Sequence, residues 1–95
     1  MSYQPTGMIG SVAGVKTVVE TPAQAFAGGS ALSPRSRIRV TNLSTHTRVR
    51  VGRQSANLQR DGIPVEPGDT LSLYPTTTIF ACSEGSAITI QIEEK

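Results

Sequence analysis

The sequence contains no tryptophan, and its 95 residues include only two Phe, two Tyr, one Cys and one His. A hydrophobic core must therefore be built mainly from Val, Ile and Leu. The single cysteine, Cys82, excludes a disulfide within the chain and provides no metal-binding spacing. We expect Cys82 to be a small buried residue of a strand, as free cysteines usually are.

Charged residues are also few. They make up 17% of the chain, and the formal net charge of +2 is far below that of a dedicated nucleic-acid-binding domain. No apolar segment approaches the roughly 20 residues of a membrane span, and residues 1–14 have neither the basic region nor the apolar run of a signal peptide. We therefore expect synthesis in a reducing cytoplasm and no membrane partner.

The residues that enzymes use are scarce and poorly placed. His46, the only histidine, falls in a predicted turn between two threonines and has no partner for acid–base chemistry. Asp61, Glu66 and Asp69 are close in sequence, but each lies beside Gly or Pro and the spacing lacks the dense alternation of a calcium loop. We expect no catalytic residue, no cofactor and no metal site.

Short segments rich in β-branched residues alternate with turn signals after residue 14. The clearest is 86–93, in which three isoleucines alternate with polar residues. The other strand candidates are 15–21, 37–40, 47–51, 63–65, 69–74 and 79–82. Together they predict a single all-β domain over residues 15–95, either a small antiparallel β-sandwich of jelly-roll-like form or a partly open barrel, with six or seven short strands.

The segments between these strands carry weaker signals. Pro64 should place the 63–65 strand at the edge of a sheet, because proline cannot donate a ladder hydrogen bond. Residues 22–34 are interpreted as a long crossover in which Phe26 and Leu32 cover the edge of the core. Residues 54–62 are interpreted as a polar loop anchored by Leu58, and we expect no stable helix.

The segment 36–53 contains two runs in which arginines alternate with aliphatic residues, joined by a short polar linker. Alternation at period two places the aliphatic side chains on one face of a sheet and the arginines on the other. The short linker favours an antiparallel hairpin, which would gather four guanidinium groups on one face: Arg37, Arg39, Arg48 and Arg50. Because like charges opposite one another are destabilising, some other group should neutralise them.

Three sources of neutralising groups are open. Acidic groups of a partner protein suit arginine, whose planar guanidinium pairs bidentately with carboxylates. Nucleic acid is disfavoured, because single-strand-binding surfaces add aromatic stacking platforms and no aromatic residue lies between Leu32 and Leu73. Acidic residues of flanking strands in the same chain could also balance the arginines: Glu20, Glu93 and Glu94.

Residues 1–14 contain three glycines, one proline and no charge. Such a segment should not fold alone, and its simplest interpretation is a frayed terminus. It nevertheless carries side chains that could be buried on another subunit by β-augmentation or arm exchange: Tyr3, Met8, Ile9 and Val12. We therefore predict an extended N-terminal arm that orders against a neighbouring subunit.

The order of motifs in the second half resembles a known family. The first two motifs in this order are Thr41-Asn42-Leu43-Ser44 and Val49-Arg50-Val51-Gly52. The next two are Gly62-Ile63-Pro64-Val65 and Glu66-Pro67-Gly68-Asp69-Thr70. A Leu-rich strand, the segment Ile79-Phe80-Ala81 and a final alternating strand complete the order. Over roughly residues 15–93 this order resembles the small β-sandwich virion proteins of tailed phages. That family occurs as head decoration (cement) proteins and at the bases of head or tail fibres.

The resemblance implies a non-enzymatic structural protein that binds and stabilises the assembled phage head at the capsid surface. It further implies a homo-oligomer, with a trimer favoured, whose partner is the major capsid protein or another virion protein. One alternative is a fibre-base or neck/tail adaptor of the same particle. Another is a β-sandwich binding module for nucleic acid or glycans, although Tyr74 is the only outward-facing aromatic residue in a clear strand.

Overall fold

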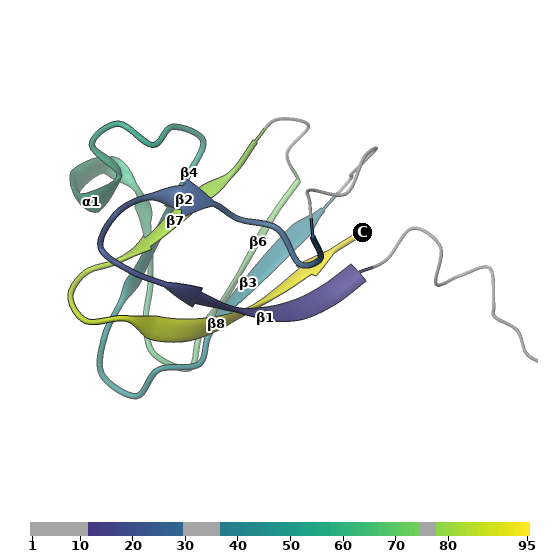
Figure 1. Ribbon diagram of the computed structural model, residues 1–95, viewed down its shortest axis with the longest axis horizontal. Helices are drawn as coiled ribbons and strands as arrows, with labels where there is room; N and C mark the ends of the chain where they lie inside the picture. The colour runs from purple at the N-terminus through teal and green to yellow at the C-terminus, as the bar shows by residue number, and fades with distance from the viewer. Residues whose placement is uncertain (1–11, 30–36, 75–77) are drawn as a thin grey trace, which may run out of the picture.

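The computed structural model describes residues 12–29, 37–74 and 78–95. Within them, eight strands form two four-stranded antiparallel sheets (Figure 1). The elements are β1 (Val12–Val18), β2 (Ala23–Gln24), β3 (Ile38–Asn42), β4 (Val49–Gly52), α1 (Leu58–Asp61), β5 (Ile63–Val65), β6 (Thr70–Leu73), β7 (Phe80–Ser83) and β8 (Ile88–Glu94). The all-β sandwich is confirmed, and the partly open barrel is wrong because the strands divide into two separate sheets.

The two sheets have the strand order of a jelly roll. Sheet A runs β1-β8-β3-β6 and sheet B runs β2-β7-β4-β5. Each strand of the first half therefore pairs with its counterpart in the second half: β1 with β8, β2 with β7, β3 with β6 and β4 with β5. This is a long hairpin rolled into two layers. Every connection except the one between β4 and β5 crosses from one sheet to the other.

The core lies between the sheets and consists of aliphatic side chains, as the composition requires. The inward-facing side chains predicted from alternation are buried, with at most 1% exposure for all but Ile88 at 8%: Ile38, Val40, Val49, Val51, Ile88, Ile90 and Ile92. Leu71 and Leu73 of the edge strand β6 are half-buried against the same core. The alternating sequence pattern therefore identified the inner face of each of these strands.

β3 and β4 do not form the predicted hairpin, which is a correction to the sequence interpretation. β3 lies in sheet A between β8 and β6, whereas β4 lies in sheet B between β7 and β5. The fully buried Asn42, at the end of β3, connects the layers: its Nδ2 donates to the carbonyl oxygens of Thr47 at 2.8 Å and Val65 at 2.9 Å. Its Oδ1 accepts from the backbone N–H and hydroxyl of Ser44 at 2.9 and 2.7 Å.

The N-terminal strand also differs from its prediction. β1 begins at Val12, inside the predicted arm, and ends at Val18, before the predicted end at Thr21. Part of the predicted crossover is the short strand β2, paired with β7. The chain after β2 covers the inner face of β1 so closely that a Cβ built on Gly14 would lie 2.2 Å from the carbonyl oxygen of Ala27.

A single helical turn, α1, replaces the loop predicted at residues 54–62 and packs on β4 and β7 of sheet B. Leu58 is the anchored residue, as predicted, with 2% exposure. Gly52 and Gly62 make room for it: a Cβ on either would lie 2.9 Å from Leu58 Cδ1. Pro64 lies in β5 at the edge of sheet B, as predicted.

Candidate protein-binding surface

The four arginines are separated by the fold. Arg39 of β3 is on the outer face of sheet A, whereas Arg50 of β4 and Arg48 just before it are on the outer face of sheet B. Arg37 precedes β3 and its backbone exchanges two hydrogen bonds with Lys95, at 3.0 and 2.9 Å. The expectation of four guanidinium groups on one face is wrong, because the alternating runs belong to opposite layers of the sandwich.

Carboxylates from two turns neutralise the arginines of sheet B. Glu84, after β7, accepts from the Nε atoms of Arg48 at 3.1 Å and of Arg50 at 2.5 Å. Glu66, after β5, lies 3.4 Å from Arg48 Nη1. Partial burial alone would raise the pKa of the Glu84 carboxyl, but the hydrogen bonds and charges of the two arginines outweigh burial and lower this pKa below its usual value. The cluster therefore holds two cations and two anions.

One carboxylate neutralises Arg39 on the outer face of sheet A. Glu93 of β8 is the cross-strand neighbour of Arg39, and its Oε1 lies 3.2 Å from Arg39 Nη1. Both side chains are about 40% exposed, at 40% and 41%. Of the acidic residues expected to balance the arginines, Glu93 is therefore a partner. Glu94 instead points inward, with 1% exposure, and accepts a hydrogen bond from the backbone N–H of Ala27 at 2.8 Å.

The outer face of sheet A carries few charged side chains besides this ion pair. One row across the sheet consists of Val15, Gln91, Thr41 and Thr70, and the next consists of Ala13, Glu93, Arg39 and Ser72. The hydroxyl groups of Thr41 and Thr70 lie 2.9 Å apart. Val15 is 61% exposed. Four adjacent strands thus present two rows of mostly neutral side chains that contain a single ion pair. Arg37 and Lys95, whose backbones pair next to the second row, follow the alternation of Arg39 and Glu93 and add two positive charges at the end of this face.

The predicted arm residues have different outcomes. Tyr3, Met8 and Ile9 lie outside the described residues. Val12 is the first residue of β1, opposite Glu94 of β8, and packs against the core. The prediction that Val12 belongs to an arm is therefore wrong, and β1 begins three residues before the predicted boundary at residue 15.

The described residues contain no group of three or more His, Cys, Asp or Glu side chains that could hold a metal ion. His46 is exposed in the β3–β4 connection, where its Nδ1 lies 2.9 Å from the hydroxyl of Thr45. Cys82 is fully buried, as predicted, and burial raises the pKa of its thiol, an effect that the charge of Arg50 partly opposes. No helix in the described parts of the chain is long and apolar enough to cross a membrane.

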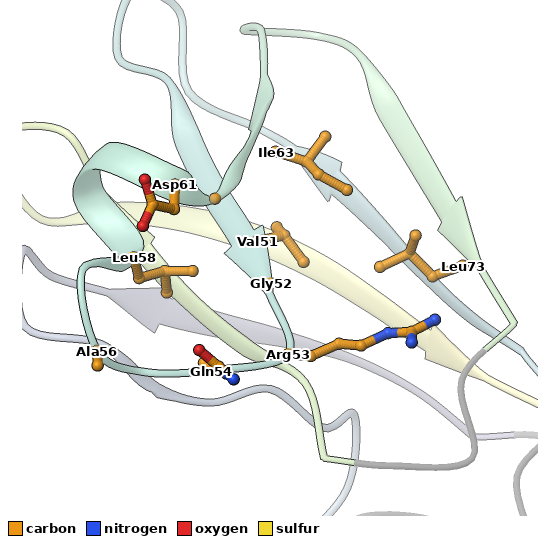
Figure 2. A pocket seen from close by; sticks show the side chains of 10 residues that line it. Val51, Gly52, Arg53, Gln54, Ala56, Leu58, Asp61, Ile63 and Leu73 are labelled. Atoms are coloured by element: carbon orange, nitrogen blue, oxygen red, sulfur yellow. The ribbon is translucent and has the colours of Figure 1, made fainter.

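A cleft of about 480 Å³ lies beside α1 (Figure 2). Its aliphatic lining comes from Val51, Leu58 and the residues Ile63 and Leu73 of the edge strands β5 and β6. The polar side chains that line it are Arg53, Gln54 and Asp61. The side chain of Arg53 extends along the mouth of the cleft toward Leu73 (Figure 2). No nucleophile or acid–base pair lines it.

Sequence reasoning missed Glu66 and Glu84 as partners of the arginines. Both lie in the turns that follow strands, beside Pro67 and Gly85; Glu66 was considered only as a calcium ligand, and Glu84 was not considered. Their position directly after β5 and β7 was the available signal, since these two strands flank β4.

No protein-family model matches this chain, and neither the curated proteins nor the solved structures that were compared with it gave a match. The strand order of its two sheets defines the protein as a small jelly-roll sandwich.

Proposed function

We propose that this chain is a non-enzymatic structural protein of a tailed-phage particle, which binds the assembled head through protein–protein contacts. The sequence resemblance supports the virion role, and the jelly-roll topology agrees with it because viral capsid proteins commonly use this architecture. That agreement is an analogy of fold. The major capsid protein is the proposed partner, and the proposed location is the outer surface of the head.

The outer face of sheet A is the observation that carries the proposal. Along its two rows the side chains are neutral except for the Arg39–Glu93 pair, and the further charges of Arg37 and Lys95 lie at the end of the face. A surface with few charges costs little to desolvate when a protein partner covers it. The outer face of sheet B is a weaker candidate, because its arginines and glutamates are already paired with one another and α1 covers part of it.

Attachment to the assembled head, without affinity for free capsid subunits, would stabilise the shell by mass action. When the free concentration of the protein is about 100 times its dissociation constant, binding contributes about 2.7 kcal/mol to the stability of the shell per occupied site. Residues 1–11 precede β1, at one edge of sheet A, and in this proposal they extend the contact onto a neighbouring subunit. A fibre-base or neck adaptor of the same particle is the second candidate, because a neutral sheet face suits that partner equally well.

Two charge-reversal variants test which face is used. Arg39→Glu places a second carboxylate beside Glu93 on sheet A, and Arg48→Glu places one beside Glu66 and Glu84 on sheet B. Both variants change the net charge by the same amount, so each controls for the other. We expect the wild-type protein and Arg48→Glu to co-sediment with heads that lack this protein, and Arg39→Glu to show reduced occupancy.

Equal loss of binding in both variants would reject sheet A as the docking face. Absence of wild-type binding to heads, tails and fibres would reject the virion role itself. Binding to tails or isolated fibres, but not to heads, would select the adaptor.

A further inference from the structure

β1 is the longest of the four edge strands that the described residues form. It has seven residues, whereas β2, β5 and β6, the other three edge strands, have two, three and four. On one side β1 pairs with β8 along its whole length. On its other side, in the part of the chain that the structure describes, no backbone hydrogen bond joins β1 to another segment. Its outward N–H and C=O groups therefore form a template for a further strand.

β1 lacks most of the features that protect edge strands from pairing. Natural edge strands are usually short or contain proline, a bulge or an exposed charge. β1 contains no proline, pairs with β8 residue by residue without a bulge, and exposes only Ala13, Val15 and Thr17 on its outer face. Its one charged residue, Lys16, points inward, where its Nζ donates to the carbonyl oxygen of Gly28 at 2.6 Å.

We propose that two copies of this protein associate through their β1 strands, paired antiparallel, so that the two A sheets become one eight-stranded sheet. A two-fold axis through Val15 places Val15 opposite Val15 of the second copy. It also sets Ala13 opposite Thr17, Gly14 opposite Lys16, and Val12 opposite Val18. A second copy is the occupant because β1 carries a single charge, Lys16, which this register sets opposite Gly14 and not opposite the Lys16 of the second copy.

The charges in this register favour the two-fold arrangement. Like charges directly across a strand pair are destabilising, but here Lys16 meets Gly14, which has no side chain to obstruct it. The ammonium group of Lys16 also lies 4.6 Å from the centre of the Phe26 ring in its own subunit, so it is held away from the new ladder. At the axis, the two Val15 side chains, each 61% exposed in the monomer, cover one another and so bury apolar surface.

A seven-residue ladder is small beside the roughly 1,200–2,000 Å² of stable interfaces, so the dimer should be weak, with a dissociation constant on the order of 10 μM. The inference does not depend on the proposed function, because the isolated protein is tested in the absence of phage particles. Analytical ultracentrifugation from about 1 to about 500 μM spans both sides of such a constant. We expect a reversible transition from monomer to dimer over that range.

Val15→Lys is the disrupting variant, because it sets two like charges against each other at the axis. Its matched control is Thr70→Lys, which adds the same charge to the outer face of β6, at the opposite edge of sheet A and across from the uncharged Thr41. We expect Val15→Lys to remain monomeric at the highest concentration and Thr70→Lys to dimerise like the wild type. Far-UV circular dichroism checks that both are folded.

Two cysteine variants test the register. In a pair centred on Val15, the two Cα atoms at position 15 would lie about 4.5–5.5 Å apart, within the range for a disulfide. The two Cα atoms at position 17 would be separated by four residues along the strands, about 13 Å, which no disulfide spans. We expect Val15→Cys to form a cross-linked dimer under mild oxidation and Thr17→Cys not to form one.

A wild-type protein that stays monomeric to about 500 μM would overturn the inference. A trimer, a dimer lost in Thr70→Lys but kept in Val15→Lys, or cross-linking of Thr17→Cys as readily as of Val15→Cys would overturn it equally, since each result requires another interface or another register.

Discussion

Replacing Asn42 by alanine should destabilise the protein more than any other polar substitution in the β3–β4 connection. The Asn42 side chain makes four hydrogen bonds, two of them to backbone carbonyls of the β4–β5 side of the sandwich. Each buried hydrogen bond contributes about 1 kcal/mol net, and a buried carbonyl left without a donor costs about 1–3 kcal/mol. Water can replace the bond at the half-buried Thr47 but not easily at the buried Val65.

The expected loss for Asn42→Ala is therefore about 3 kcal/mol. For a domain of this size, 1 kcal/mol corresponds to about 4–8 °C in Tm, so Tm should fall by roughly 12–24 °C. Ser44→Ala is the matched control, because it removes the Ser44 hydroxyl from the same cluster but leaves both cross-sheet bonds of Asn42 in place. That variant should lose no more than about 1 kcal/mol.

Asn42→Asp distinguishes lost hydrogen bonds from lost packing, because the side chains have nearly the same shape. A carboxylate keeps the bonds from Ser44 but has no proton to donate to the carbonyls of Thr47 and Val65. Folding should therefore raise the pKa of the introduced carboxyl, so the destabilisation is greatest above that pKa and shrinks as the pH falls and the group is protonated. Urea unfolding followed by circular dichroism measures all three variants. If the free energies of unfolding of Asn42→Ala and Ser44→Ala agree within about 1 kcal/mol, the cross-sheet hydrogen bonds of Asn42 do not fix the β3–β4 connection.

Three further predictions concern other parts of the sandwich. Gly14→Ala should lower the free energy of unfolding by about 1–3 kcal/mol, because the added methyl group overpacks against the Ala27 carbonyl oxygen. Gly29→Ala is the control and should leave Tm unchanged, because no atom lies within 4 Å of a Cβ built there. Equal Tm values for the two variants would contradict the close contact at Gly14. Because folding lowers the pKa of Glu84, its contribution to stability is complete above the unfolded pKa near 4.5 and is lost as the pH falls through the lower folded value. Glu84→Gln should therefore flatten the acid limb of a stability–pH curve, and an unchanged limb would reject the pairing. The Cys82 thiol should react with a thiol reagent only when the protein unfolds, at a rate that rises with denaturant; fast labelling without denaturant would contradict its burial.

The sequence was sufficient for features that depend on local pattern. Alternation identifies the buried side of a strand because successive side chains point to opposite faces, and Ile90 and Ile92 are buried accordingly. Pro64 identified an edge strand for a similarly local reason. Leu58 was identifiable as an anchor because it is the only large apolar residue in a polar segment, and it is the buried residue of α1.

The pairing partners of β3 and β4 could not be predicted in this way. Six residues separate the two strands, a length that suits both a hairpin and a crossing between sheets. The choice depends on distant contacts: β8 and β6 occupy both sides of β3, so no side is left for β4. The bond between Asn42 and Ser44 spans two residues and is a local turn contact, whereas the bond between Asn42 and Val65 spans 23 residues and depends on the fold.

The wrong prediction that the four arginines share one face has the same cause, because the sequence pattern does not say which sheet a strand joins. An arginine that alternates with buried valines is known only to face away from the core, and a sandwich has two such faces on opposite sides. Arg39 and Arg50 therefore follow one sequence rule and reach different surfaces. Each surface supplies its own carboxylates through topology, from Glu93 directly across the strand pair and from Glu84 at the end of the neighbouring strand β7. Since this pairing neutralises Arg39, Arg48 and Arg50 within one chain, an acidic partner is not needed to explain these three arginines. The outer face of sheet A and the unpaired edge of β1 become the surfaces on which a partner would gain most.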